Sequence, residues 1–272
     1  MSEYTSTTGF CSVPGASLYY ECAGEGYPLL LLHAGIADSR MWDDQFSTFA
    51  QHYRTIRYDL RGYGQTRWED GSFAAYEDPA ALFKVLGVEK AHVIGISYGG
   101  KIALDFALAH PELVASLVLV APSVGGEEPS EEIRRFAEEE DVLFEQYNLP
   151  AATELNLCMW VDGPQRTPDQ VASSVRQRVY EMQYHAFTLP MPPGADEQEL
   201  QPAAITRLTE VRAPTLIIVG DLDLPAKLEL SQRLARDISG ARLEIIEGAA
   251  HMVSMEKPQA FNQFVLDFLP EL

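Results

Sequence analysis

The sequence predicts an α/β fold: a mostly parallel sheet of eight strands, with helices on both faces and a helical insertion. Continuous apolar runs, typical of strands buried on both faces, alternate with segments of helical spacing along most of the chain. Such alternation favours a parallel sheet covered by helices on each side. The alternation stops between 124 and 205, where the chain becomes acidic and polar and has no buried-strand run.

The chain opens with two short β-rich pieces, which fit an antiparallel hairpin. The eight strands are expected at 10–13, 16–24, 27–35, 53–60, 92–96, 113–123, 213–221 and 241–248. Helices of the sheet layers are expected at 38–52, 72–88, 98–110, 226–238 and 257–269. We therefore predict a core domain from 1–123 and 206–272, with 124–205 as a helical cap (lid) over the carboxyl edge of the sheet, where open α/β sheets bind ligands.

Composition limits the function classes. The net charge of −20, from 40 acidic and 20 basic residues, opposes binding to nucleic acid or to an anionic membrane, because both need cationic clusters. The cysteines (Cys11, Cys22 and Cys158) are odd in number and widely spaced, which favours reduced, buried thiols. The N-terminal residues lack the features of a signal peptide and no apolar run is long enough to span a membrane. We expect a cytoplasmic protein, monomeric or homodimeric.

The stretch "HVIGISYGG" carries the first chemical signal. It places Ser97 in a G-x-S-x-G pattern between a predicted strand and a predicted helix, as a nucleophile elbow requires. The glycines let the backbone turn sharply and approach closely, and the helix that follows presents its positive end to a developing anion. The alternative is an incidental serine in a glycine-rich turn.

A serine hydroxyl needs a base, and the base needs a group that orients it. His251 lies in a loop of small residues, "EGAAH", after the last predicted strand, whereas the other histidines lie at helix ends, at a strand start or in the insertion. Asp221 and Asp223 follow a buried strand in "LIIVGDLDLPA". The chain order serine, aspartate, histidine is that of enzymes with a nucleophile elbow.

These residues give the chain its resemblance to the α/β-hydrolase superfamily. "LLLHAGIADSRMWDDQF" resembles the family's oxyanion loop, "YDLRGYGQT" its D-x-R-G-x-G-x-S turn and "GISYGG" its elbow. "PTLIIVGDLDLP" resembles the acid segment, and "EGAAHMVSMEKP" the histidine loop. Within the superfamily the chain is most similar to 3-oxoadipate enol-lactonase-like hydrolases and small carboxylesterases.

The resemblance implies a role for each matching position. Ser97 would be the nucleophile, His251 the general base and then acid, and Asp223 the orienting carboxylate, because the acid pattern counts from the glycine at 220. The oxyanion hole would consist of the backbone N–H groups of Ile36 and Tyr98. The sequence departs from the family's pattern at Ala34, Thr66 and Ala250, and none of these changes removes a reacting group.

We therefore expect a serine hydrolase that cleaves a small ester or lactone through an acyl-enzyme, with no metal or cofactor. Met159, Trp160, Tyr180 and Tyr184 of the cap are the candidate pocket residues, or else they hold the cap's own helices together. The acidic cap would repel carboxylate substrates, unless buried arginines such as Arg134 or Arg176 bind them.

Other functions fit the same three groups. The triad also serves hydrolysis of C–C bonds in dicarbonyl compounds and perhydrolysis, and a fold does not distinguish these reactions. A ligand receptor or signalling protein with slow turnover is the alternative from another class.

Overall fold

The computed structural model describes residues 6–270. The strands of its main sheet follow the order β1-β2-β4-β3-β7-β8-β10-β11, and the two-residue β5 pairs with β2 beside this path. The β1–β2 and β2–β4 pairs are antiparallel, and every pair from β4 to β11 is parallel. The strands are β1 (Thr7–Val13), β2 (Ala16–Ala23), β3 (Pro28–Leu32), β4 (Arg54–Tyr58), β5 (Arg67–Trp68), β7 (Ala91–Ile96), β8 (Val114–Val120), β10 (Thr215–Gly220) and β11 (Arg242–Ile246). The predicted fold class, with eight main strands that are mostly parallel, is confirmed.

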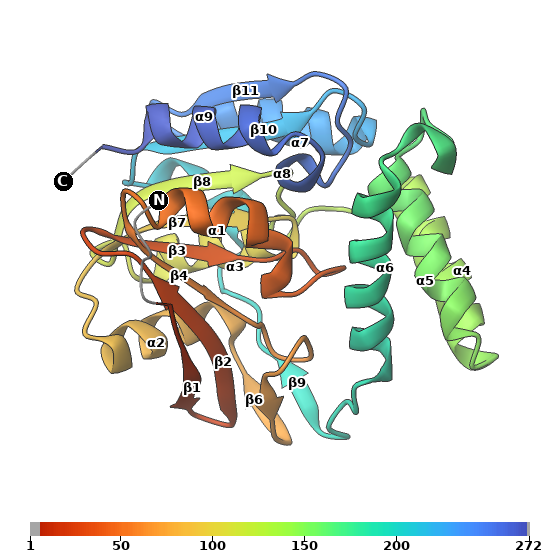
Figure 1. Cartoon of the computed structure of the whole chain (residues 1–272), viewed down its shortest axis with the longest axis horizontal. Coiled ribbons are helices and arrows are strands. Elements are labelled where there is room, and N and C mark those ends of the chain that lie inside the picture. Colours follow the sequence, from red (N-terminus) through yellow and green to blue (C-terminus); the bar gives the residue numbers. More distant parts are fainter. Residues whose placement is uncertain (1–5, 271–272) are drawn as a thin grey trace.

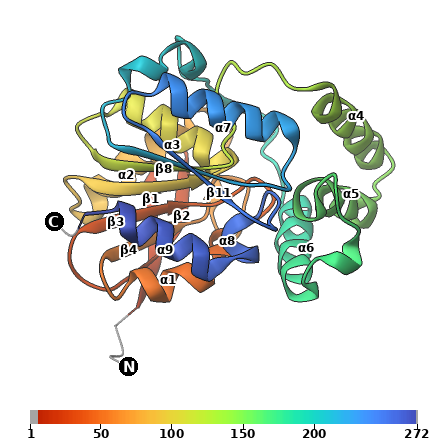
Figure 2. The same cartoon turned by 90° about the horizontal axis from the view of Figure 1, so that it is seen from above.

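Helices cover both faces of this sheet. Figure 2 shows α1, α8 and α9 on one side and α2, α3 and α7 on the other. They are α1 (Asp43–Phe49), α2 (Asp78–Leu86), α3 (Tyr98–Ala109), α7 (Pro225–Asp237), α8 (Val253–Glu256) and α9 (Pro258–Phe268). Pro79 lies in the first turn of α2, where its missing N–H costs no hydrogen bond, so it starts the helix rather than breaking it.

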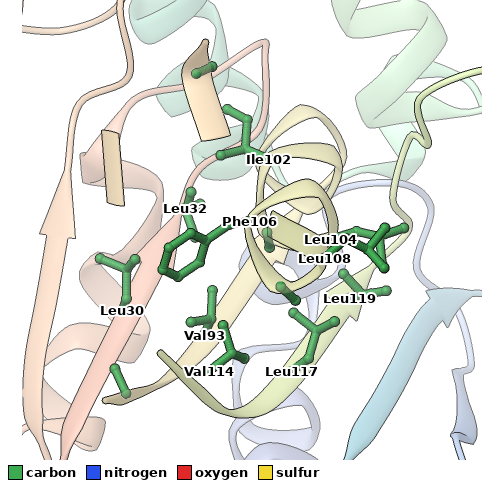
Figure 3. Packing of buried hydrophobic residues seen from close by; sticks show 14 of the residues in the cluster. Leu30, Leu32, Val93, Ile102, Leu104, Phe106, Leu108, Val114, Leu117 and Leu119 are labelled. Carbon is green, nitrogen blue, oxygen red and sulfur yellow. The ribbon is translucent and has the colours of Figure 1, made fainter. Parts of the chain in front are cut away.

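Alternation along the central strands separates two hydrophobic layers. Leu30 and Leu32 of β3 face the layer under α2, α3 and α7, whereas Leu29 and Leu31 face the layer under α1 and α9. Figure 3 shows the first layer, in which Phe106 of α3 packs over β3 and β7. Since the central strands are buried on both faces, the loops at the ends of these strands are the accessible part of the sheet.

The helices α4 (Glu131–Glu145), α5 (Leu149–Leu157) and α6 (Ser173–Thr188), which lie between β8 and β10 in the chain, form a separate group beyond the carboxyl ends of the strands, as Figure 1 shows. The same stretch of chain contains the π-helical turn Cys158–Asp162 and the short strand β9 (Ala195–Glu197). The strand β9 pairs with β6 (Gly71–Phe73), which lies in the loop after β4. This pairing joins the insertion to the loop region at the edge of the main sheet.

Two further findings concern the cysteines and the membrane. All three cysteines are free, and Cys11 and Cys22 are buried as predicted. The prediction that Cys158 is buried is wrong, because Cys158 lies on an exposed surface of the π-helical turn. In the part of the chain that the structure describes, none of the helices combines the length and the apolar character needed to cross a membrane.

Candidate active site

Ser97 occupies the sharp turn between β7 and α3. Its backbone has φ 55° and ψ −113°, a backbone conformation that residues other than glycine rarely adopt. Three hydrogen bonds hold it there: its N–H donates to Val120 O (2.9 Å), and its carbonyl accepts from the N–H groups of Lys101 and Ser123 (both 3.0 Å). A strained turn that the surroundings hold in place is typical of a functional position.

Two glycines make room for this turn. A Cβ on Gly95 would lie 2.2 Å from Gly99 O, and a Cβ on Gly99 would lie 2.4 Å from His33 O. Both distances are far below van der Waals contact, so no side chain fits at either position. The elbow is therefore packed directly against the loop that follows β3.

His251 and Asp223 form a buried hydrogen-bonded pair. The distance from His251 Nδ1 to Asp223 Oδ2 is 2.8 Å, and both side chains are almost wholly buried. The other oxygen of Asp223 accepts the N–H of Leu224 at 2.7 Å, which fixes the carboxylate. His251 Nε2 is also buried and has no hydrogen-bond partner within residues 6–270, so this nitrogen is available as a proton acceptor.

Ser97, Asp223 and His251 lie at one edge of the sheet. They follow β7, β10 and β11, and these strands run parallel through β8, so their carboxyl ends meet at the same edge. Asp221, the second aspartate of that segment, instead accepts the N–H of Gly248 at 2.7 Å. The geometry thus joins Asp223, and not Asp221, to the histidine.

A buried lysine connects the elbow with the acid segment. Lys227 Nζ donates to Pro122 O and to Ser123 Oγ, both at 3.2 Å, and Ser123 in turn donates its N–H to Ser97 O. Burial lowers the pKa of Lys227, and the nearby charges of Glu127 and Asp223 partly oppose this. Nothing in the sequence pattern pointed to this residue, since a lysine in the first turn of a helix is ordinarily solvated.

The loop after β3 is held beside the elbow by His33. Its Nε2 accepts the N–H of Leu60 (2.9 Å), which leaves the proton on Nδ1 to donate to Ala34 O (2.8 Å). Burial lowers the pKa of His33, which favours this neutral form. His33 thus ties the loop after β3 to the turn that follows β4.

The two predicted oxyanion-hole residues lie on either side of this junction. Tyr98 is the first residue of α3, so its N–H has no acceptor within the helix. Ile36 is buried in the adjoining loop, and a Cβ built on its neighbour Gly35 would lie 3.3 Å from Tyr98 Cβ. The loop and the start of the helix are therefore in contact, as two donors to one oxygen would need to be.

The turn after β4 accommodates the threonine at its end. Thr66 Oγ1 donates to Asp59 O (2.5 Å) and accepts the N–H of Tyr19 (3.0 Å). Either hydroxyl residue could make these bonds, so the exchange of serine for threonine leaves the turn intact.

Glu256 and Arg166 hold the histidine loop, and sequence reasoning assigned a role to neither. Glu256 accepts the N–H of Ala250 (2.9 Å) with one oxygen and pairs with Arg166 (2.6 Å) through the other. Both side chains are largely buried. The E-x-P pattern after the histidine was the available signal for Glu256, whereas Arg166 lies 90 residues away in the insertion.

The four candidate pocket residues separate into two pairs. The ring of Trp160 lies 4.8 Å from the ring of His251, and Met159 lines a cavity that also touches Leu224, next to Asp223. Tyr180 and Tyr184 stack on one another along α6 at 5.9 Å, and Tyr180 lines a different hollow beside Arg176. The structure therefore brings Met159 and Trp160 to the histidine side of the site.

The two arginines considered as carboxylate ligands are both engaged elsewhere. Arg134 is exposed, contrary to the prediction, because it lies on the solvent face of α4, where it donates to Pro129 O. Arg176 pairs with Asp162 at 2.8 Å and with Glu154 at 2.6 Å. Within residues 6–270, no cluster of three or more histidine, cysteine, aspartate or glutamate side chains is arranged to hold a metal ion.

Comparison with known proteins identifies the class. The profile of the family described as "alpha/beta hydrolase fold" matches residues 27–258. The chain therefore belongs to the α/β-hydrolase fold family, and it is a hydrolase.

Three similar proteins illustrate the range of this family. The chain is 30% identical over 261 residues to the "Putative carbamate hydrolase RutD" of Azorhizobium caulinodans, covering 94% of this chain and 96% of that protein. It is 26% identical to the 2-hydroxy-6-oxo-6-phenylhexa-2,4-dienoate hydrolase of Comamonas testosteroni, covering 93% and 91%. It superimposes on the enol-lactonase of Burkholderia xenovorans LB400 with a TM-score of 0.78 over 96% of this chain and 99% of the other, at 22% identity, which shows the fold alone.

Proposed function

We propose that the protein is a cofactor-free serine hydrolase that cleaves a small ester or lactone through an acyl-enzyme on Ser97. The observation that carries this proposal is the buried His251–Asp223 pair, which lies at the same sheet edge as Ser97 in its strained turn. The Nε2 atom of His251 has no hydrogen-bond partner among the described residues. A scaffold needs none of these features for its stability. Together they supply a nucleophile, a base and an orienting acid.

The first half of the reaction forms the acyl-enzyme. Ser97 Oγ attacks the carbonyl carbon while His251 Nε2 takes the hydroxyl proton, and Asp223 stabilises the imidazolium and keeps Nδ1 as the donor. The N–H groups of Ile36 and Tyr98 donate to the oxyanion of the tetrahedral intermediate, each worth about 3–4 kcal/mol in the transition state. His251 then gives its proton to the leaving oxygen as the C–O bond breaks.

The second half releases the acid. His251 takes a proton from water, whose oxygen attacks the acyl carbon, and returns that proton to Ser97 Oγ when the ester bond to the enzyme breaks. The ring of Trp160 lies 4.8 Å from that of His251, and Met159 is the chain neighbour of Trp160, so we expect both side chains to shield these steps from bulk water.

The test is hydrolysis of p-nitrophenyl esters from acetate to octanoate. We expect turnover by the wild-type protein and a loss of roughly a million-fold in Ser97→Ala, as when the serine of such a triad is removed. Ser47→Ala, an exposed serine on α1, is the matched control. Ester hydrolysis that survives Ser97→Ala would refute the role of Ser97.

A second candidate is hydrolysis of a 2-hydroxy-6-oxo dienoate, favoured by the similarity to the Comamonas testosteroni enzyme. Turnover of such a dienoate with no turnover of any ester would select this alternative. Slow turnover of every substrate, with a cap stabilised by a ligand, would instead indicate a receptor.

A further inference from the structure

The insertion is strongly acidic, and it forms one wall of the site. Residues 124–205 include 16 acidic residues, five arginines and no lysine, so they carry most of the chain's net charge of −20. A substrate that enters between this insertion and the sheet edge meets a negative potential. Its own charge is therefore a factor in binding.

Every arginine of the insertion already has a partner within the protein. The partners are carboxylates or carbonyl groups: Pro129 O for Arg134, Glu131 for Arg135, Glu256 for Arg166, Asp162 and Glu154 for Arg176, and Asp44 for Arg178. The cations nearest the elbow are engaged as well. Lys101 lies 3.2 Å from Glu199, and Lys227 is buried on Pro122 O and Ser123 Oγ.

A cavity of about 550 Å³ lies between α4, the π-helical turn and the start of α7. Its apolar lining includes Phe136, Leu155, Met159, Pro164 and Leu224. This volume is in the range of small-molecule sites, roughly 300–1,000 Å³, which are mostly apolar. Leu224 follows Asp223 directly and Met159 precedes Trp160, whose ring lies 4.8 Å from that of His251, so the cavity is lined by chain neighbours of two residues on the histidine side of the site.

Three carboxylates belong to the lining of this cavity. Glu131, Glu132 and Glu139 of α4 line it and are exposed, and Arg135, also on the lining, pairs with Glu131. The one cation among the lining residues, Arg135, therefore already has a carboxylate partner.

The elbow side carries negative charge too. Tyr98 donates its hydroxyl to Glu197 at 2.8 Å. Burial, followed by the charges of Glu197 and Glu140, raises the pKa of Tyr63 to about 12. The hydroxyl of Tyr63 lies 3.4 Å from the position of a Cβ on Gly35 in the oxyanion loop.

We propose that the cavity between α4, the π-helical turn and Leu224 receives the uncharged, apolar acyl chain of the substrate, and that the site rejects acyl chains that end in a carboxylate. The inference rests on the proposed serine-hydrolase function. A carboxylate placed there would lose its hydration without gaining a cation, among side chains of its own sign. An alkyl chain has no such cost and gains from burial.

The first experiment compares two p-nitrophenyl esters of equal acyl length, the hexanoate and the mono-ester of adipic acid, at low salt. We expect kcat/KM for the hexanoate to exceed that for the adipate by about tenfold or more, because a carboxylate among these side chains loses part of its hydration and gains no cation. From acetate to hexanoate, kcat/KM should rise by up to about fourfold for each methylene that the cavity buries. Equal kcat/KM for the two six-carbon esters would overturn the inference.

A variant that fills the cavity tests whether the acyl chain binds there. Cys158 lines the cavity and is exposed, so Cys158→Trp fills space without disturbing the core, and Cys158→Ser is its control. We expect the tryptophan variant to lose its preference for hexanoate over acetate by about tenfold, as two or fewer methylenes remain buried. An unchanged preference would show that the acyl chain lies elsewhere.

Two double variants of α4 test the effect of charge. Glu132→Gln/Glu139→Gln removes two charges from the lining of the cavity, and the control, Glu138→Gln/Glu145→Gln, removes two charges from positions that do not line it. The first pair should narrow the hexanoate-to-adipate ratio by about fivefold, a modest change because exposed charges are screened. An equal effect of both pairs would refute a local cause. Each activity is also measured in Ser97→Ala, so that failure of the proposed function can be told from failure of this inference. Esterase activity that survives Ser97→Ala would refute the proposed function, whereas the hexanoate-to-adipate ratio tests the selection against charged acyl chains.

Discussion

Asp105→Asn should change how the stability of the protein depends on pH. Asp105 lies on α3, two turns beyond Ser97, with its nearest cation, Lys101, at 3.7 Å. Its Oδ1 is buried and has no hydrogen-bond partner among the described residues. Burial, opposed by Lys101 and reinforced by the charges of Glu199 and Glu197, raises the pKa of Asp105 from 3.8 to about 6.

The magnitude follows from the linkage between protonation and folding. Because the folded protein holds this proton up to a higher pH than the unfolded chain does, Asp105 favours folding most below pH 3.8, and this contribution is lost as the pH rises through about 6. The full shift corresponds to about 3 kcal/mol. Between about pH 4.5 and about pH 7.5, the wild-type protein should therefore lose about 2 kcal/mol relative to Asp105→Asn, which has no such proton.

Urea denaturation of both proteins across this pH range measures the difference. The free energy of unfolding of the variant minus that of the wild type should increase with pH, with equal m-values showing that both unfold in the same manner. A difference that stays constant, or that decreases as the pH rises, would refute the assignment of a raised pKa to Asp105.

Three further substitutions, the first with Asp221→Asn as its control, test the site. Asp223→Asn should lower kcat for a p-nitrophenyl ester by about 10⁴, because the imidazole loses its orienting carboxylate, whereas Asp221→Asn should retain kcat within about threefold; similar losses in both would contradict the pairing seen here. Glu256→Gln should lower kcat by about tenfold and the melting temperature by about 2–4 °C, since it weakens the hold on the loop that carries His251; an unchanged kcat would deny Glu256 a positioning role. Tyr98→Phe should raise KM more than it lowers kcat, because it cuts the hydroxyl bond from the elbow helix to the insertion but keeps the backbone N–H; the reverse pattern would place that hydroxyl in the chemistry.

The local motifs made much of this site predictable. The glycines around Ser97 mark a turn that only small residues permit, and the mostly parallel sheet covered by helices follows from the alternation of apolar and helical segments. The segment after β10 offered two aspartates, and residue types alone did not distinguish them. The family's acid pattern, which counts from the glycine at 220, favoured Asp223, and the hydrogen bond from His251 shows that Asp223 is the partner.

Contacts between distant segments could not be predicted in this way. Glu197 meets Tyr98 across 99 residues and Arg166 meets Glu256 across 90, and a single sequence contains no pattern that links them. The same holds for the engagement of Arg176 with two carboxylates, which decides that it does not bind a substrate. The exposure of Cys158 likewise depends on how the π-helical turn lies in the insertion.

The measurement that tests the account most directly is the covalent labelling of the serine. A fluorophosphonate reagent reacts with a serine that a neighbouring base activates, and peptide mass spectrometry locates the label. We predict stoichiometric labelling of Ser97 in the wild-type protein and almost none in His251→Ala, whose folded state is checked by circular dichroism. Labelling at another residue, or ester turnover by a protein whose Ser97 stays unlabelled, would contradict the mechanism.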